Sequence, residues 1–403
     1  MKLTRLTRTA TVLTSAAVAL TLGAVPAIAL GQHDGQADAR DAGTHARDVE
    51  RAVAAYRAMQ EHLYVGDGSQ LYLERTVPTA DDRPYSFEWP FSQAHVATLD
   101  LTGIPGRVGR SFQDDLADRK AGQERYWNAA GGTTGKPGYD SYARAPYGDG
   151  GDMFYDDNEW VALAKVQEYL QTGDREALKR AKQIFSLVET AWDTDTTHAA
   201  PGGVFWTQAP WSTDRNTVST IPGAELAVRL YLITKDRSYL EWAMRSVAWT
   251  DANLLAPNGL YWDNVKLDGT IDKTQWSYNQ GTPIGTYTLL YEATGDRSYL
   301  KKAQAIAAAS LAYYLEDGRL EAQPIYFNSI YFKNLQLLES VTGGHTYRDA
   351  QQAYADGLWS DVRDPATDLF PVGGTATTLL DQAAVVQLYA TLAWPKGKAS
   401  TLY

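Results

Sequence analysis

Residues 169–178 read YLQTGDREAL, residues 231–240 read YLITKDRSYL, and residues 291–300 read YEATGDRSYL. One pattern thus returns about every sixty residues, which indicates stacked copies of a single supersecondary unit. Where the copy contains a glycine, that residue can end one helix in the left-handed conformation, and the following aspartate can cap the next helix. The three stretches therefore predict tight turns between paired helices.

The helices on the two sides of these turns differ in their apolar pattern. After the first turn, residues 177–192 place their apolar side chains on one stripe and their charges elsewhere, which is typical of a surface helix. By contrast, residues 274–291 contain no charge, and residues 375–394 contain only Asp381. Because a helix that is apolar on nearly all sides is buried, amphipathic outer helices should alternate with buried inner ones.

This alternation predicts an all-α fold, an (α/α)6 toroid of six inner and six outer helices. An open α-solenoid is the alternative, but its last repeat should be polar, whereas the last helix here is among the most apolar. We expect outer helices near 46–63, 110–127, 174–192, 236–252, 296–315 and 345–359, and inner helices near 91–102, 157–172, 217–233, 280–294, 325–341 and 376–394.

The N-terminus has the pattern of a signal peptide. Three cations precede an uncharged stretch from Thr9 to Leu30, and Ala27-Ile-Ala29 supplies the small-residue cleavage pattern. A membrane anchor is the alternative, but the apolar core is short for a span. We therefore expect a signal peptide over 1–29, a flexible lead-in over 30–44, and a single catalytic domain over 45–403.

Composition limits the partners. The formal net charge is −11 and the cations are scattered, so a nucleic-acid partner is not expected. There are no cysteines, and the six histidines show no metal-ligand spacing, which predicts a protein without metal or cofactor. After cleavage we expect a secreted monomer without a membrane association.

Two adjacent carboxylates give the sharpest chemical signal. Asp156 and Asp157 stand where a long loop meets an inner helix, with no basic residue nearby in sequence. Like charges this close disfavour simultaneous ionisation, so the pKa of one carboxyl should rise. One ionised and one protonated carboxyl is what glycoside hydrolysis requires. The alternative is that one aspartate caps the inner helix.

The long loops at the same end of the predicted ring carry aromatic and amide side chains. They include Gly202-Gly-Val-Phe-Trp206, Gly259-Leu-Tyr-Trp262 and Trp276-Ser-Tyr-Asn-Gln-Gly281. Aromatic faces can stack on sugars, and amides can bridge neighbouring hydroxyls. Each residue also has a structural alternative, namely core packing for the tryptophans and capping for Asn279 and Gln280.

Together these segments resemble glycoside hydrolase family 76, the bacterial and fungal α-1,6-mannanases, over about residues 50–395. The resemblance rests on Tyr155-Asp-Asp-Asn158 with Trp160, Gly202-Gly203 with Trp206, Asn216, and Tyr278-Asn-Gln-Gly281. It departs from the family where Glu159 replaces a residue that is usually small and Val161 replaces a second tryptophan.

The resemblance implies an (α/α)6 fold and endo cleavage of α-mannan with retention, with Asp156 as nucleophile and Asp157 as acid/base. The candidate substrate-binding residues are Tyr155, Trp206, Asn216, Trp262, Tyr278, Asn279 and Gln280. Three alternatives remain open at this point. They are an α-mannan transglycosylase, a non-catalytic glycan-binding protein, and a sugar epimerase, which would need histidines such as His95 at an inner-helix mouth.

Overall fold

A computed structural model describes the backbone of residues 34–403 and the side chains of residues 43–403. The predicted signal peptide with its cleavage site, and the first residues of the lead-in, lie outside the described residues. Helix α1 begins at Asp34 and ends at Leu63, so it starts earlier than the expected 46.

In the described part of the chain, six inner helices alternate with six outer helices, as the sequence predicts. The inner helices are α2 (Glu88–Thr102), α5 (Tyr155–Thr172), α7 (Thr217–Thr234), α9 (Tyr278–Thr294), α11 (Ile325–Thr342) and α13 (Leu379–Leu392). The outer helices are α1, α4 (Gln113–Gln123, after the turn α3, Arg107–Ser111), α6 (Arg175–Val188), α8 (Arg237–Leu254), α10 (Arg297–Tyr314) and α12 (Thr346–Gly357).

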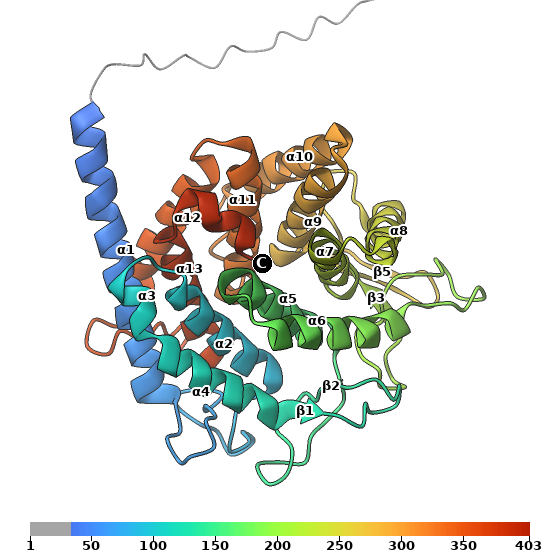
Figure 1. Ribbon diagram of the computed structural model, residues 1–403, viewed down its shortest axis with the longest axis horizontal. Coiled ribbons are helices and arrows are strands. Elements are labelled where there is room, and N and C mark those ends of the chain that lie inside the picture. The colour runs from blue at the N-terminus through green and yellow to red at the C-terminus, as the bar shows by residue number, and fades with distance from the viewer. Residues whose placement is uncertain (1–33) are drawn as a thin grey trace, which may run out of the picture. The chain divides into compact units, whose positions relative to one another are not determined.

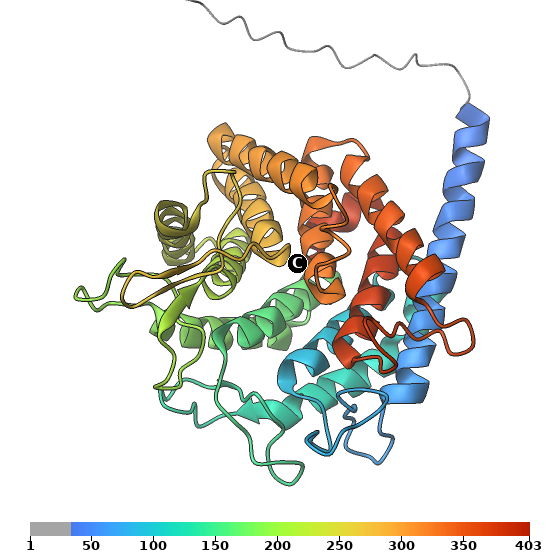
Figure 2. The ribbon, with the colours of Figure 1, turned by 180° about the vertical axis from the view of Figure 1, so that it is seen from behind.

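The inner helices form a closed ring. Each packs against the next along the chain, and α13 packs against α2 to complete the circle (Figures 1 and 2). The last inner helix also contacts the first outer helix. Gln382 of α13 donates from Nε2 to the carbonyl oxygen of Ala55 in α1 at 2.9 Å. Closure confirms the toroid and is incompatible with an open solenoid.

The repeated turns have the geometry expected from their sequences. Gly173 and Gly295 end their helices with φ of 76° and 74°, in the left-handed region. The side chains of Asp174, Asp236 and Asp296 each cap the following helix by accepting a backbone N–H two residues on. At these turns the chain reverses direction between an inner helix and the following outer helix. The turns therefore lie at one end of the ring, and the long loops lie at the other end.

The C-terminal residues enter the centre of the ring (Figures 1 and 2). A short 3-10 turn, η4 (Lys396–Thr401), precedes Leu402 and Tyr403, which are fully buried. The Tyr403 ring stacks on Trp160 of α5 with ring centroids 6.2 Å apart, and its backbone N–H donates to Gln167 at 3.2 Å. The axis of the toroid is therefore filled by protein.

Short strands brace the long loops. Strand β1 (Trp127–Asn128) pairs with β2 (Gly138–Tyr139), and β3 (Asp214–Asn216), β4 (Asn264–Lys266) and β5 (Ile271–Asp272) form a three-stranded antiparallel sheet. One-turn helices follow α4, α6 and α12 at η1 (Glu124–Tyr126), η2 (Glu189–Ala191) and η3 (Leu358–Val362). Within the described part of the chain, no helix is both long and apolar enough to cross a membrane.

Candidate active site

Asp156 and Asp157 occupy the first turn of α5 at the loop end of the ring. The helix begins at Tyr155, and the residue at its N-cap, Phe154, contributes no side-chain hydrogen bond. Both aspartates therefore lie inside the helix rather than at the capping position, so the structure does not support the capping alternative. The positive end of the helix dipole favours a negative charge at this place.

The residue after the pair fixes the direction of this first turn. Asn158 is fully buried, and its Oδ1 accepts the backbone N–H of Tyr139 in β2 at 2.7 Å. Its Nδ2 donates to the Tyr139 carbonyl at 2.9 Å and to the Phe154 carbonyl at 2.8 Å. Because these bonds hold both sides of the amide, they fix the loop carrying β2 to the start of α5.

Asp156 accepts two hydrogen bonds that stabilise its charged form. The indole N–H of Trp206 donates to its Oδ2 at 3.2 Å, and the backbone N–H of Asp157 donates to its Oδ1 at 3.1 Å. Burial, and then the neighbouring charge of Asp157, raise the pKa of Asp156 well above its usual range, and the two hydrogen bonds oppose that rise. Donors aimed at a carboxylate stabilise its charged form.

Asp157 lies under the influence of a third carboxyl that the sequence analysis missed. Burial, and then the carboxyl of Glu88, raise the pKa of Asp157 well above its usual range. Glu88 is the first residue of α2 and is fully buried, and its own pKa is raised to about 8, chiefly by burial. Among the described residues no donor is bonded to the Asp157 carboxyl, so no hydrogen bond opposes the rise in its pKa.

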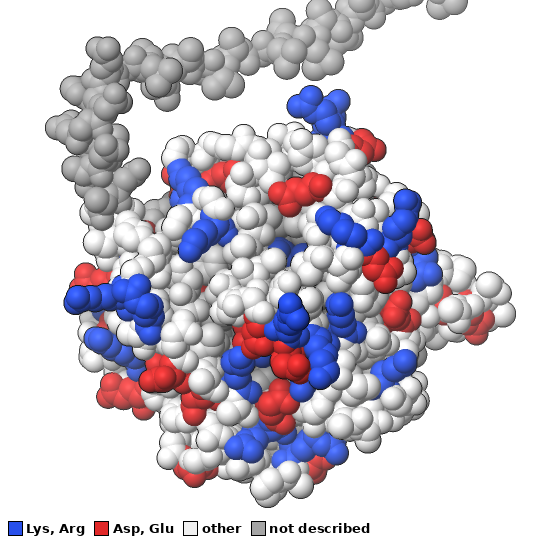
Figure 3. Space-filling view, in the orientation of Figure 1, with Lys and Arg blue, Asp and Glu red and all other residues white. Residues whose placement is uncertain are grey.

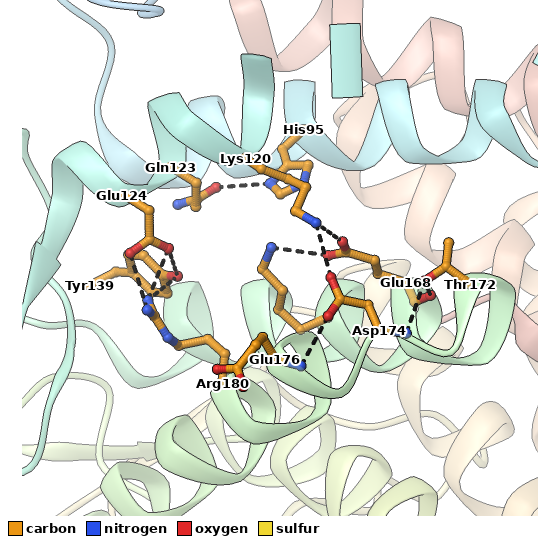
Figure 4. A network of polar contacts seen from close by, with 11 residues as sticks. His95, Lys120, Gln123, Glu124, Tyr139, Glu168, Thr172, Asp174, Glu176 and Arg180 are labelled. Carbon is orange, nitrogen blue, oxygen red and sulfur yellow. Dashed lines mark hydrogen bonds and ion pairs between the residues drawn. The ribbon is translucent and has the colours of Figure 1, made fainter. Parts of the chain in front are cut away.

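Glu88 is held by a side chain of the outer helix α4. Gln123 at the end of α4 donates from Nε2 to Glu88 Oε1 at 2.6 Å. The Oε1 of Gln123 lies 3.4 Å from His95 Nδ1 (Figure 4). Burial, and then the nearby Lys165 charge, lower the pKa of His95 well below its usual range, so the imidazole is neutral. His95 lines neither cavity at the aspartate pair, which removes the basis for the epimerase alternative.

A cavity of about 280 Å³ opens beside the pair and is polar on one wall. Asn216 of β3 and Asn264 of β4 face one another in the strand register and line it together with Asp263. The carbonyl oxygens of both asparagine side chains are buried without a hydrogen-bond partner among the described residues. Buried acceptors without partners are costly unless a ligand supplies donors, and sugar hydroxyls are such donors.

Aromatic side chains also line this cavity. Tyr278 at the start of α9 stacks on Phe327 of α11, with ring centroids 3.8 Å apart and planes inclined by 10°. Trp89, Trp160 and Trp206 also line the cavity. Of the predicted binding residues, Trp206, Asn216 and Tyr278 are thus brought to the aspartates.

Four predicted binding residues lie elsewhere. Tyr155 and Trp262 pack into apolar clusters and line neither cavity at the pair. Gln280 is fully buried and bonds to the backbone of Tyr261, with which it exchanges bonds of 2.7 and 3.0 Å. Asn279 does not line the cavity itself. Its Nδ2 donates to Asp263 Oδ1 at 2.9 Å and so orients a carboxylate that does.

A larger charged cavity of about 440 Å³ lies between α4, α5 and α6, and charges of both signs gather over it (Figure 3). Its charged groups neutralise one another: Lys120 pairs with Asp174 at 3.1 Å, and Arg180 pairs with Glu124 at 3.0 Å (Figure 4). This cavity does not contain the aspartate pair, and we assign no chemistry to it. Residues 43–403 also contain no cluster of side chains suited to a metal ion.

A closed double ring of helices with two carboxyls at the mouth of one inner helix, beside a cavity of amides and aromatic rings, defines the class of (α/α)6 proteins with a two-carboxylate carbohydrate site. The chain belongs to glycosyl hydrolase family 76, whose sequence model matches residues 50–356. This confirms the resemblance found in the sequence.

Individual relatives agree with this assignment. The mannan endo-1,6-alpha-mannosidase DCW1 of Candida glabrata is 30% identical over 140 residues, which cover 32% of this chain and 31% of that protein. The chain thus spans about a third of the length of this curated relative.

Two solved structures share the fold. A family 76 mannosidase of Bacteroides thetaiotaomicron matches with a TM-score of 0.75 and 24% identity, over 86% of this chain and 98% of that one. The α-1,6-mannanase GH76A of Salegentibacter, as an inactive variant with two adjacent aspartates replaced by asparagine and bound to α-1,6-mannotriose, matches with a TM-score of 0.66 and 20% identity, over 86% of this chain and 99% of that one.

Proposed function

We propose that this protein is a secreted, retaining, endo-acting glycoside hydrolase that cleaves α-1,6-mannan backbones by double displacement. The observation that carries the proposal is the carboxylate pair in the first turn of α5, at the junction of two cavities at the loop end of the ring. Two further facts support it. The curated relative is named for α-1,6-mannan cleavage, and the Salegentibacter enzyme is inactive when two adjacent aspartates are replaced.

In the first step, an oxygen of the Asp156 carboxylate attacks the anomeric carbon. Asp157 donates its proton to the glycosidic oxygen as the bond between carbon and oxygen breaks, so the leaving chain departs as a neutral alcohol. The product is a glycosyl ester of Asp156. Two contacts support this division of roles: Asp156 accepts two N–H groups, whereas burial and Glu88 favour the protonated form of Asp157.

In the second step, Asp157 is a carboxylate and acts as a base. It takes a proton from water, the water oxygen attacks the anomeric carbon, and the ester bond breaks to restore the Asp156 carboxylate. Two displacements return the original α configuration. No metal ion or cofactor takes part, so activity should survive excess EDTA.

The two aspartates should fail in different ways when replaced. Asp156→Ala removes the nucleophile and should abolish turnover of every substrate. Asp157→Ala should still form the ester from a mannoside with a dinitrophenolate leaving group, which needs little protonation. Added azide should then accelerate turnover and give an α-mannosyl azide, which proton NMR identifies.

Asp361→Ala, which changes an exposed aspartate beyond α12, is the matched control and should leave activity unchanged. Reversed behaviour of the Asp156 and Asp157 variants would exchange their roles. An initial product of β configuration from the wild type would exclude retention.

The proposal includes export as a monomer, with residues 1–29 as signal peptide, 30–44 as lead-in and 45–403 as one catalytic domain. N-terminal sequencing of protein from the culture medium should begin Leu30-Gly31-Gln32. Material that retains Met1 in the medium would contradict the cleavage site.

A further inference from the structure

A second cavity meets the polar one at the carboxylate pair. It has a volume of about 650 Å³ and runs along the loops before α2 and α5. The two cavities share Trp89, Asp157 and Trp206, whereas Asp156 lines only the smaller, polar one. The pair thus stands between two spaces of different chemical character.

The positions of the two aspartates give the orientation of the substrate. A nucleophile must reach the anomeric carbon, so the sugar under attack lies in the cavity that contains Asp156. The acid must reach the oxygen between that sugar and the next one, and Asp157 lines both cavities. The leaving portion of the chain then extends into the larger cavity.

The larger cavity is lined by aromatic rings that are exposed to solvent. Phe87 is 44% exposed and Trp206 is 37% exposed, and Trp211, which adjoins the cavity through Phe154, is 53% exposed. Large apolar side chains gathered on one exposed surface usually mark a binding site. Flat rings with solvent on one face suit the C–H surfaces of sugar rings.

These rings are held in place before any ligand binds. The indole N–H of Trp211 donates to Asp152 Oδ2 at 3.3 Å, and its ring packs edge-on against Trp206 with centroids 6.0 Å apart. Phe87 packs edge-on against Tyr142, with centroids 5.5 Å apart. Rings that are already ordered lose little conformational entropy on binding, so they can contribute affinity.

We call the larger cavity, together with the adjoining Trp211, the aromatic groove. We infer that this groove binds the reducing-end portion of the mannan, which is the part that leaves in the first step. Phe87 and Trp211 are its sugar-stacking residues. The inference rests on the proposed function, because it uses the assigned roles of Asp156 and Asp157. It assigns different tasks to the two cavities. The polar cavity recognises the hydroxyls of the sugar under attack through Asn216 and Asn264, whereas the groove recognises ring faces.

The test compares two substrates in Phe87→Ala and Trp211→Ala. One is the 2,4-dinitrophenyl glycoside of α-1,6-mannobiose, whose sugars all lie on the nonreducing side of the bond that breaks. The other is α-1,6-mannohexaose labelled at its reducing end. The control is Met244→Ala, which removes a side chain on α8 that is 41% exposed and lines neither cavity.

We expect kcat/KM for the hexaose to fall about tenfold in each groove variant, the effect of losing about 1.4 kcal/mol of stacking. The value for the dinitrophenyl glycoside should change less than twofold, and the labelled products should become shorter as binding shifts toward the nonreducing side. Equal losses on both substrates, an unchanged hexaose rate, or longer labelled products would overturn the inference. A wild-type enzyme that cleaves no α-1,6-mannan would instead overturn the proposed function.

Discussion

Replacement of the buried Glu88 by glutamine should separate the contribution of this third carboxyl to stability from its contribution to catalysis. Glu88→Gln keeps the shape of the side chain and an oxygen that can accept the Gln123 bond, but it cannot ionise. The folded protein raises the pKa of Glu88 from 4.5 to about 8. At about 1.4 kcal/mol per pH unit, this rise corresponds to a cost of up to about 5 kcal/mol once the group is fully ionised.

The sign of the pH dependence follows from the direction of this change. Because the pKa of Glu88 is higher in the folded state, its contribution to stability is fully present below about pH 4.5 and is lost as the pH rises through about 8. Wild type and Glu88→Gln should therefore have similar free energies of unfolding at pH 4. At pH 9 the variant should be the more stable by several kcal/mol. Urea unfolding followed by tryptophan fluorescence at pH 4, 7 and 9 measures the difference.

The same variant should shift the activity profile. The charge of Glu88 helps to raise the pKa of Asp157, so its removal should lower that pKa and move the alkaline limb of kcat/KM to lower pH. Glu61→Gln, an exposed position on α1, is the control. An alkaline limb that stays in place or moves upward, or a variant no more stable than wild type at pH 9, would refute this account of the site.

Three further variants test how the ring supports the site. Gly281→Ala would place a methyl group 2.7 Å from the Tyr331 backbone, so it should lower the free energy of unfolding by about 1–3 kcal/mol. Tyr403→Ala leaves a cavity at the ring centre against Trp160, and should cost about 3 kcal/mol in urea unfolding and also lower kcat, since Trp160 lines the polar cavity. Gln280→Ala breaks bonds to loop backbone, so thermal unfolding should show a lower Tm while kcat/KM is retained; a large fall in kcat/KM at unchanged Tm would place its side chain in the cleft after all.

The fold could be predicted because its information is local and repeated. Each turn contains its own capping residue, and charge is absent from residues 274–291, which form most of the inner helix α9, so the alternation of rings can be read without knowledge of tertiary contacts. The predicted ends of the helices were less accurate where the sequence contains no capping residue. Helix α5 was expected to begin at 157 but begins at Tyr155, which places both aspartates inside its first turn.

The site could be predicted only in part, because a helix turns by about 100° at each residue. At the start of α9, Tyr278 lines the polar cavity, but the next two residues point elsewhere: Asn279 toward Asp263 and Gln280 toward the Tyr261 backbone. No property of their sequence fixes that rotation. It depends on how α9 packs against its neighbours, which the linear pattern does not contain.

The residues that were missed had a weaker signal. Asp263 and Asn264 directly follow Trp262, the last residue of a segment that was recognised, and they reach the cavity although Trp262 does not. Glu88 stands at the mouth of an inner helix beside Trp89, in a place equivalent to that of the aspartate pair on α5. Polar residues in the first turn of every inner helix are therefore the positions to inspect.

The carboxylate pair differs from some other buried carboxylates in its lack of cationic partners. Asp100 pairs with Lys333 at 2.8 Å, and Glu225 pairs with Arg229 at 2.9 Å. Among the described residues, neither Asp156 nor Asp157 has an ion-pair partner. A buried carboxyl without a partner destabilises the fold when it ionises, so its presence in a groove indicates a function that offsets the cost.

Glu159 shows that a buried carboxyl without an ion-pair partner is not necessarily a reacting group. It is fully buried, and neither of its carboxyl oxygens has a hydrogen-bond partner among the described residues. Burial, and then the charge of Asp156, raise the pKa of Glu159 well above its usual range. Yet its Oε1 faces Gly223 of α7, where an added methyl group would lie only 2.7 Å away, and it lines neither cavity. A reacting carboxyl must combine a raised pKa with access to the substrate, and on α5 only Asp156 and Asp157 have both.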